Sequence, residues 1–422
     1  MRILYLTFNA PPVKNVASFR TEAYLNYLPK EGIEVDVLTR HYGDGDSIGS
    51  DFELMKSDAP ERLPANTEGP VYYTGFYNYV NHSRFYRATR SLLRVITNLY
   101  LVDAYYYGWK KFAIEYFDQH LRHKKYDLII ATFNPLMTFV VAQELSKKYG
   151  IPWFAEYRDS FVVESDKNKT LLYKKLVQAR ALKGASKILV VSEGITDQLQ
   201  RSLLKKQQHK EIVIIRNGYD ELIQPGLHPD DGAVWGQFQE LRKHYASVLV
   251  HTGTVYQHQN YGFFLDCLKR YNAGNESKIA IVLAGLNKDG MVFNPLLQKD
   301  VYLFPKVNTS TALLMQAEAD VLILPAWYSN RYTGFIAKVF EFLWFGKHVW
   351  SSPAPPKDFA QFISTFPHVQ ILSDYASFET NMQQLQAHQN KLQNTGAFDK
   401  QVLTRKFWMQ ELANHIRSAV KQ

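Results

Sequence analysis

The chain has 422 residues, of which 46% are hydrophobic and 21% charged, and its formal net charge is +9. This length exceeds one ordinary hydrophobic core and predicts two domains of roughly 200 residues each. A single cysteine, Cys267, excludes an internal disulfide and fits a reducing cytoplasm. No run of about 18 apolar residues occurs, so we expect no membrane-spanning helix. The positive charge favours an anionic partner, which by charge alone is a nucleotide, a membrane surface or a nucleic acid.

Short β-branched runs alternate with helical stretches along the sequence, which is typical of parallel sheets in α/β proteins. The first run, at residues 2–7, is too short for a signal-peptide core and is interpreted as a buried strand. The strands predicted next in the first half are 34–38, 128–132, 153–156, 187–191 and 212–215. Those predicted in the second half are 247–251, 279–284, 301–304, 320–324, 348–351 and 369–372. Two such sets predict two doubly wound, Rossmann-like domains that face each other across a cleft.

A turn at 217–220 and the Pro- and Gly-containing stretch at 224–229 mark the expected domain boundary. We therefore predict an N-terminal domain at 1–217 and a C-terminal domain at 218–403. The remaining residues, 404–422, include an amphipathic helix with its large apolar side chains on one side.

A basic aromatic segment interrupts the first domain at about 75–120. Four arginines recur there at helical spacing, opposite an apolar face, namely Arg84, Arg87, Arg90 and Arg94. One interpretation is an interfacial helix on an anionic membrane surface. The alternative is a surface helix with a solvated basic face. No nucleic-acid-binding module is recognisable, so we expect no nucleic-acid partner.

Acidic and basic side chains follow the strand predicted at 153–156. Glu156, Arg158 and Asp159 lie at its carboxyl end, where ligands bind in doubly wound folds. A carboxylate there can accept a proton or orient a hydroxyl group, and Asp159 is the candidate for that role. Arg158 would be its counter-charge. A purely structural Arg–Asp pair explains the same residues.

The segment 332–350 combines a glycine turn, an apolar helix and a short strand. Lys338 and Glu341 are three residues apart and share one helical face near the start of the helix. A cation and helical N–H groups suit phosphate oxygens, and a carboxylate one turn further suits sugar hydroxyls. The pattern therefore predicts a nucleotide-diphosphate site. A buried α/β helix that carries one capping acid is the alternative.

These segments together resemble GT-B glycosyltransferases of family four, which are involved in bacterial cell-surface polysaccharides. The Gly-Phe turn at 334–335, Glu341 and the Phe-Gly-Lys ending at 345–347 resemble the family's nucleotide-sugar signature. The resemblance also covers Leu249–Tyr256, with its Gly-Thr turn, and the Asn-Gly turn at 217–218. It implies that the last helix crosses back onto the first domain.

The resemblance implies a role for each of these residues. The donor-binding set is Gly253, Thr254, Lys306, Val307, Tyr328, Thr333, Gly334, Phe335, Ile336, Lys338 and Glu341. Lys338 would stabilise the diphosphate, Glu341 would hold the ribose, and Asp159 would act on the acceptor hydroxyl. The amide and hydroxyl groups of Gly253 and Thr254 would meet the distal phosphate. On the acceptor side we expect Asn15, Ser18, Arg20 and Arg158.

The implied protein is a cytoplasmic hexosyltransferase, retaining and metal-independent, peripheral at the inner membrane face. It would use a nucleotide-diphosphate sugar and a lipid-linked or polysaccharide acceptor, with no cofactor. Two departures from the family pattern leave alternatives open. Thr333 stands where the family's first signature glutamate is expected, and residues 257–260 lack the usual basic pair. A non-catalytic GT-B-like scaffold or a sugar-nucleotide epimerase of the same fold are the alternatives.

Overall fold

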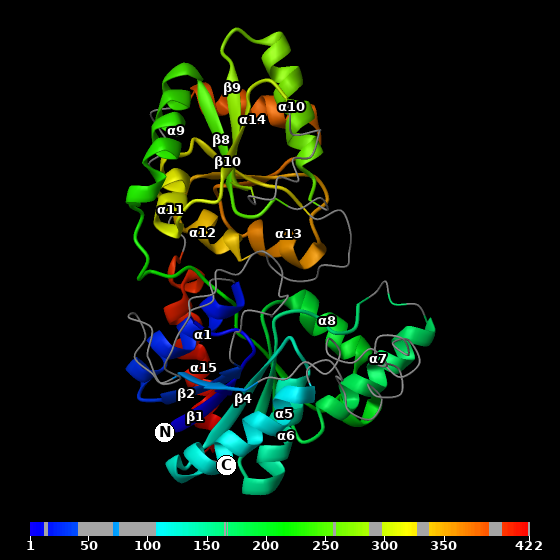
Figure 1. Ribbon diagram of the computed structural model, residues 1–422. Coiled ribbons are helices and arrows are strands. Elements are labelled where there is room, and N and C mark those ends of the chain that lie inside the picture. Colours follow the sequence, from blue (N-terminus) through cyan, green and yellow to red (C-terminus); the bar gives the residue numbers. More distant parts are fainter. Residues whose placement is uncertain are drawn as a thin grey trace, which may run out of the picture. The chain divides into compact units, whose positions relative to one another are not determined.

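The structure is a computed structural model of the chain. It describes residues 1–11, 16–40, 71–75, 107–163, 166, 168–255, 259–286, 298–326, 337–387 and 399–420. The chain divides into two units (Figure 1). The N-terminal unit comprises Met1–Asn217 and Arg405–Gln422, and the C-terminal unit comprises Gly218–Thr404.

The N-terminal unit is built on a seven-stranded parallel sheet in the order β3-β2-β1-β4-β5-β6-β7. Alternate side chains of each strand enter different cores: Leu4 and Leu6 pack on one face, and Ile3 and Tyr5 pack on the other. Both faces are therefore buried, as in other parallel sheets. The strands are β1 (Arg2–Leu6), β2 (Glu34–Arg40), β3 (Val71–Thr74), β4 (Leu128–Phe133), β5 (Trp153–Tyr157), β6 (Lys187–Val190) and β7 (Glu211–Ile214).

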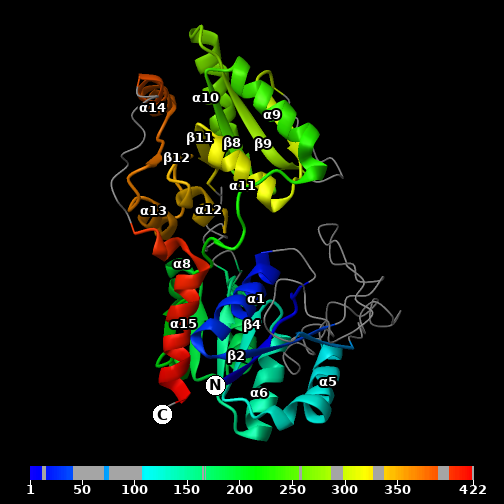
Figure 2. The same ribbon diagram turned by 90° about the vertical axis from the view of Figure 1, so that its left-hand side faces the viewer.

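Helices cover both faces of this sheet. One face packs against α1 (Val16–Tyr27) and α15 (Arg405–Val420), which lie side by side (Figure 2). Within α15 the buried residues are Met409, Leu412, Ala413 and Ile416, at the spacing of one helical face. The helices on the other face are α5 (Tyr107–Tyr116), α6 (Met137–Tyr149), α7 (Asn168–Ala181) and α8 (Glu193–Ser202).

The C-terminal unit contains a six-stranded parallel sheet in the order β10-β9-β8-β11-β12-β13. Its strands are β8 (Ser247–Thr252), β9 (Ile279–Leu286), β10 (Val301–Pro305), β11 (Val321–Leu324), β12 (His348–Ser351) and β13 (Val369–Ile371). The helices on one face are α9 (Gly232–His244), α11 (Thr309–Glu318), α12 (Lys338–Trp344) and α13 (Lys357–Ile363). Those on the other face are α10 (Tyr261–Gly274) and α14 (Tyr375–Ala387).

Short helical turns complete the described elements. They are Pro29–Glu31, Phe117–Leu121, Arg122–Lys124, Lys205–Gln207, Pro229–Asp231 and Gln401–Leu403. Among the described residues, no helix is both long and apolar enough to cross a membrane.

Both sheets start in the middle and grow outward in two directions. The direction changes between β1 and β4 in the first sheet and between β8 and β11 in the second. Ligands of doubly wound proteins bind beyond the carboxyl ends of the strands at such switch points. The carboxyl end of β8 is therefore the first place to look for a site in the C-terminal unit.

The predicted fold class is confirmed: both sheets are parallel and doubly wound. The strand β3 (Val71–Thr74), which directly precedes the basic aromatic segment, was not predicted. The arginines 84, 87, 90 and 94 lie outside the described residues, so their proposed membrane contact stays a prediction. The cleft expected between the two domains also stays a prediction.

Candidate functional site

Lys338 and Glu341 form an ion pair at the start of α12. Lys338 Nζ donates to Glu341 Oε2 at 2.8 Å, and both side chains stay partly exposed. Both residues were predicted to share a helical face, and this contact agrees with that spacing. The described part of α12 has only seven residues. We therefore assign the charge at this position to the two side chains and not to a helix dipole.

A second hydrogen bond, donated by Gln316, also holds Glu341 in place. Gln316, fully buried on α11, donates through Nε2 to Glu341 Oε2 at 3.0 Å. The same amide nitrogen donates to Thr252 Oγ1 at 2.7 Å, at the carboxyl end of β8. Three elements, β8, α11 and α12, thus meet in one hydrogen-bonded group. The carboxylate stands at the sheet edge where doubly wound folds bind ligands.

A tight turn follows β8 and makes room for Lys338. Gly253 has a φ of 127°, and a Cβ atom there would lie 3.3 Å from Lys338 Cε. Gly285, at the end of β9, has a φ of 137°, and a Cβ atom would overlap the Gly253 carbonyl oxygen. Both positions require glycine, because left-handed backbone and close approach exclude a side chain.

One expectation for this turn is wrong. The Gly253 amide was expected to face a phosphate, but it donates to the Ala284 carbonyl oxygen at 2.7 Å. Gly253 contributes space beside Lys338 instead of a hydrogen-bond donor. The half-buried Thr254 follows immediately and remains a candidate phosphate contact.

His251 lies beneath the same turn. Its Nδ1 contacts the Ile323 carbonyl oxygen at 3.1 Å, so Nδ1 carries the hydrogen and Nε2 is an acceptor. Burial, together with the nearby charge of Lys338, lowers the pKa of His251 to about 4. The imidazole is therefore neutral at physiological pH, which keeps a second positive charge away from Lys338.

The other predicted donor residues are less informative. Lys306 is exposed after β10, and the neighbouring Val307 packs against the core that α11 and α12 share. Five of the predicted residues lie outside the described part of the chain: Tyr328, Thr333, Gly334, Phe335 and Ile336.

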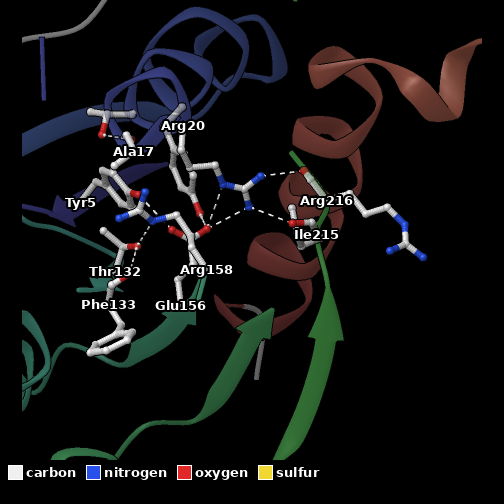
Figure 3. Close-up of polar contacts among 11 residues, drawn as sticks. Tyr5, Ala17, Arg20, Thr132, Phe133, Glu156, Arg158, Ile215 and Arg216 are labelled. Atoms are coloured by element: carbon white, nitrogen blue, oxygen red, sulfur yellow. Dashed lines mark hydrogen bonds and ion pairs between the residues drawn. The ribbon is translucent and has the colours of Figure 1, made fainter. Parts of the chain in front are cut away.

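In the N-terminal unit, a buried carboxylate occupies the end of β5. Glu156 accepts hydrogen bonds from Tyr5 at 2.9 Å, from Tyr24 at 2.8 Å, and twice from Arg20 (Figure 3). Burial alone would raise the pKa of Glu156, but the charge of Arg20 and these hydrogen bonds hold it below its usual value. The carboxylate is therefore charged, and these four hydrogen bonds engage both of its oxygens.

Arg20 extends this network to the end of the first domain. Its other N–H groups donate to the carbonyl oxygens of Arg216 at 2.7 Å and Ile215 at 3.1 Å (Figure 3). The Arg20 side chain is 1% exposed. We had expected Arg20 to contact an acceptor, and the structure corrects this: the guanidinium is used inside the fold, tying α1 to β5 and to the segment before Asn217.

Ser18, expected beside Arg20, is also fully buried. Arg158 is half-buried and donates through Nε to Thr132 Oγ1 at 3.2 Å, so it is not a dedicated partner of Asp159 (Figure 3). Asp159 is exposed after β5 and is available to solvent. Asn15 lies outside the described residues.

A basic groove of about 1300 Å³ lies on the N-terminal unit, and it is not at that unit's β1/β4 switch point. Its cations include Lys147 and Lys148 in the last turn of α6 and Arg180 at the end of α7. Positive side chains are favourable at helix carboxyl ends because they offset the helix dipole. These helices lead into the amino ends of β5 and β6, opposite the ligand-binding edge. We assign the groove no part in the site.

Comparison with solved structures defines the class of fold. A sucrose-phosphate synthase from Thermosynechococcus elongatus is similar over 99% of this chain and 98% of its own, at TM-score 0.65 and 13% identity. A glycosyltransferase from Rickettsia africae ESF-5 is similar over 100% of this chain and 99% of its own, at TM-score 0.63 and 11% identity. Anabaena HepE, solved with UDP and glucose, covers 100% and 98%, at TM-score 0.55 and 14% identity. The fold is of the GT-B type.

The sequence of the first unit gives a more specific assignment. Residues 17–218 match the family described as the glycosyl transferase 4-like domain, which confirms the predicted resemblance. This match spans most of the N-terminal unit. No curated protein sequence matches the chain.

Several site residues were not predicted from the sequence. Gln316, Thr252 and His251 join the group around Glu341, although 25 to 90 residues separate them from it along the chain. The signal for His251 was available: it is a polar residue inside the apolar run Ser247–Thr252. Gln316 offered no such signal, because it follows an unremarkable helical stretch.

Among the described residues, no group of three His, Cys, Asp or Glu residues could hold a metal ion.

Proposed function

We propose that the protein is a glycosyltransferase that takes its sugar from a nucleotide-diphosphate donor bound at the carboxyl edge of the second sheet. The observation that carries the proposal is the group of Lys338, Glu341 and Gly253 at the β8/β11 switch point. A cation beside a backbone turn suits a diphosphate, and a fixed carboxylate suits vicinal sugar hydroxyls. The glycosyl transferase 4-like domain at residues 17–218 supports the same activity.

In the proposed reaction, Lys338 stabilises the negative charge that develops on the leaving diphosphate. To do so, its ammonium group exchanges the Glu341 carboxylate for phosphate oxygens. Glu341 then accepts hydrogen bonds from the ribose. Asp159, exposed after β5, orients or deprotonates the acceptor hydroxyl.

The finer parts of the proposal follow the family resemblance. They are a lipid-linked or polysaccharide acceptor in cell-surface glycan synthesis, retention of anomeric configuration, and independence from metal and cofactor. Peripheral attachment to the inner face of the membrane through Arg84, Arg87, Arg90 and Arg94 belongs to the same proposal. Vesicle flotation tests it: changing Arg87 and Arg90 to Glu should release the protein from anionic vesicles, and unchanged flotation would refute the attachment.

The activity is tested with UDP-, GDP- and ADP-sugars carrying a labelled sugar, incubated with a membrane extract that supplies acceptors. A glycosyltransferase transfers the label and releases the nucleoside diphosphate. An epimerase changes the sugar without transfer, and a scaffold binds without turnover. Glu341→Ala should lose both donor binding and transfer. Glu276→Ala is the matched control, because this exposed acid follows α10 in the same unit.

A further inference from the structure

Glu341 uses its two carboxylate oxygens unequally. Oε2 accepts both hydrogen bonds, from Lys338 at 2.8 Å and from Gln316 at 3.0 Å. Oε1 accepts no hydrogen bond from the described part of the chain, and the side chain remains 20% exposed. Within the described part of the chain, Oε2 is therefore anchored and Oε1 is left for a ligand.

The orientation of the Gln316 amide follows from its partners. Glu341 Oε2 can only accept, so the nitrogen of the amide and not its oxygen must face it. Both hydrogens of Nε2 are then used, one on Glu341 and one on Thr252 Oγ1 at 2.7 Å. Gln316 Oε1 is buried and has no hydrogen-bond partner among the described residues. A buried, unpaired oxygen is unfavourable for folding. The Gln316 side chain therefore stabilises the structure through the two hydrogen bonds that its NH₂ group donates.

We propose that Gln316 is the positioning residue of the donor site: it holds Glu341 so that Oε1 meets the ribose diol of a nucleotide donor. The inference rests on the proposed function. It explains how the carboxylate stays in place when Lys338 leaves Oε2 for a diphosphate. The Lys338 side chain is 27% exposed, so its ammonium group has room to move, whereas Gln316 is fully buried and held in place. The cation and the acid then act on different parts of one ligand.

The test compares the affinities of ribose and dideoxyribose ligands. UDP, GDP and ADP are each titrated calorimetrically beside their 2′,3′-dideoxy forms, and the ratio of the two Kd values is recorded. In the wild type the ribose form should bind more tightly, and Glu341→Gln should remove the difference. Gln316→Met keeps the length of the side chain but has no N–H. It should lower the ratio about tenfold while leaving the dideoxy affinity within about twofold.

The possible outcomes separate the inference from the function on which it rests. If the wild type binds none of the three nucleotides, both fail. If it binds them with the expected preference and Gln316→Met keeps the full ratio, only the role of Gln316 fails. Equal weakening of both ligand forms would also overturn it, because this indicates general disruption. Thr252→Val is a second variant that frees Gln316 without touching Glu341. A ratio reduced about threefold supports the role, and an unchanged ratio refutes it.

Discussion

Replacing Glu156 by glutamine would leave the Arg20 guanidinium buried without a counter-charge. The two side chains are 0% and 1% exposed, so water cannot take the place of the carboxylate. Removing one partner of a buried ion pair costs about 3–5 kcal/mol. For a unit of this size, each kcal/mol lowers the melting temperature by roughly 2–4 °C. We therefore expect the melting transition of the N-terminal unit to fall by roughly 6–20 °C.

A double-mutant cycle separates the ion pair from simple packing loss. Arg20→Met removes the positive charge and leaves Glu156 with its two tyrosine donors. In Glu156→Gln/Arg20→Met no charge remains buried, so the two losses should not add. We expect a coupling of about 2 kcal/mol or more in the direction of recovery.

Calorimetry measures the melting transition, and hydrogen exchange shows whether that transition belongs to the N-terminal unit. Amides of 211–217 should lose protection with Glu156→Gln, because Arg20 also holds the Ile215 and Arg216 carbonyl groups. Glu34→Gln is the control: it breaks the exposed Arg2 pair and should leave the transition nearly unchanged. A loss below about 1 kcal/mol for Glu156→Gln, or additive losses in the cycle, would refute this reasoning.

Further predictions concern the C-terminal unit. Gly285→Ala should destabilise it by about 2 kcal/mol or more in chemical unfolding, because the new Cβ overlaps the Gly253 carbonyl oxygen. Gly274→Ala is the control: the new Cβ at the end of α10 has no atom within 4 Å, so this change should be neutral or slightly stabilising. Equal destabilisation by the two substitutions would contradict the prediction. Since the folded pKa of His251 is about 4, below its ordinary value of 6.5, only the unfolded state binds a proton between these values. Stability should fall by about 3 kcal/mol as pH drops through that window. His251→Gln should flatten this slope in urea titrations, and an unchanged slope would exclude His251 as its cause. Lys338→Met should weaken the binding of nucleoside diphosphates at least tenfold in calorimetry but leave the binding of free nucleosides unaffected. Similar losses of affinity for both would show that Lys338 does not contact the phosphates.

Much of the fold could be predicted because its strands are locally marked. Runs such as 128–132 are apolar throughout, and a parallel strand buried on both faces has that composition. The edge strand Val71–Thr74 is only four residues long and, like the segment that follows it, rich in tyrosine. It was therefore not recognised as a separate strand. Parallel pairing could be predicted because the strands alternate regularly with helices.

In the candidate site, only the contact between residues that are close together in the sequence could be predicted. Lys338 and Glu341 lie on one turn, so their contact follows from helical spacing. Arg20 and Glu156 are 136 residues apart, and nothing in either segment indicates that they meet. That distance explains why Arg20 was assigned to a ligand and not to the core. Gln316 was missed for the same reason: its partners lie on β8 and α12.

The central claim, that a nucleotide-diphosphate donor binds beside Lys338 and Glu341, is tested most directly by hydrogen exchange with bound nucleotide. Amides are compared with and without saturating UDP, GDP or ADP. Our account predicts new protection at 250–255 and 337–345, absent in Glu341→Gln. Protection confined to the basic groove of the N-terminal unit, or none with any nucleotide, would contradict it.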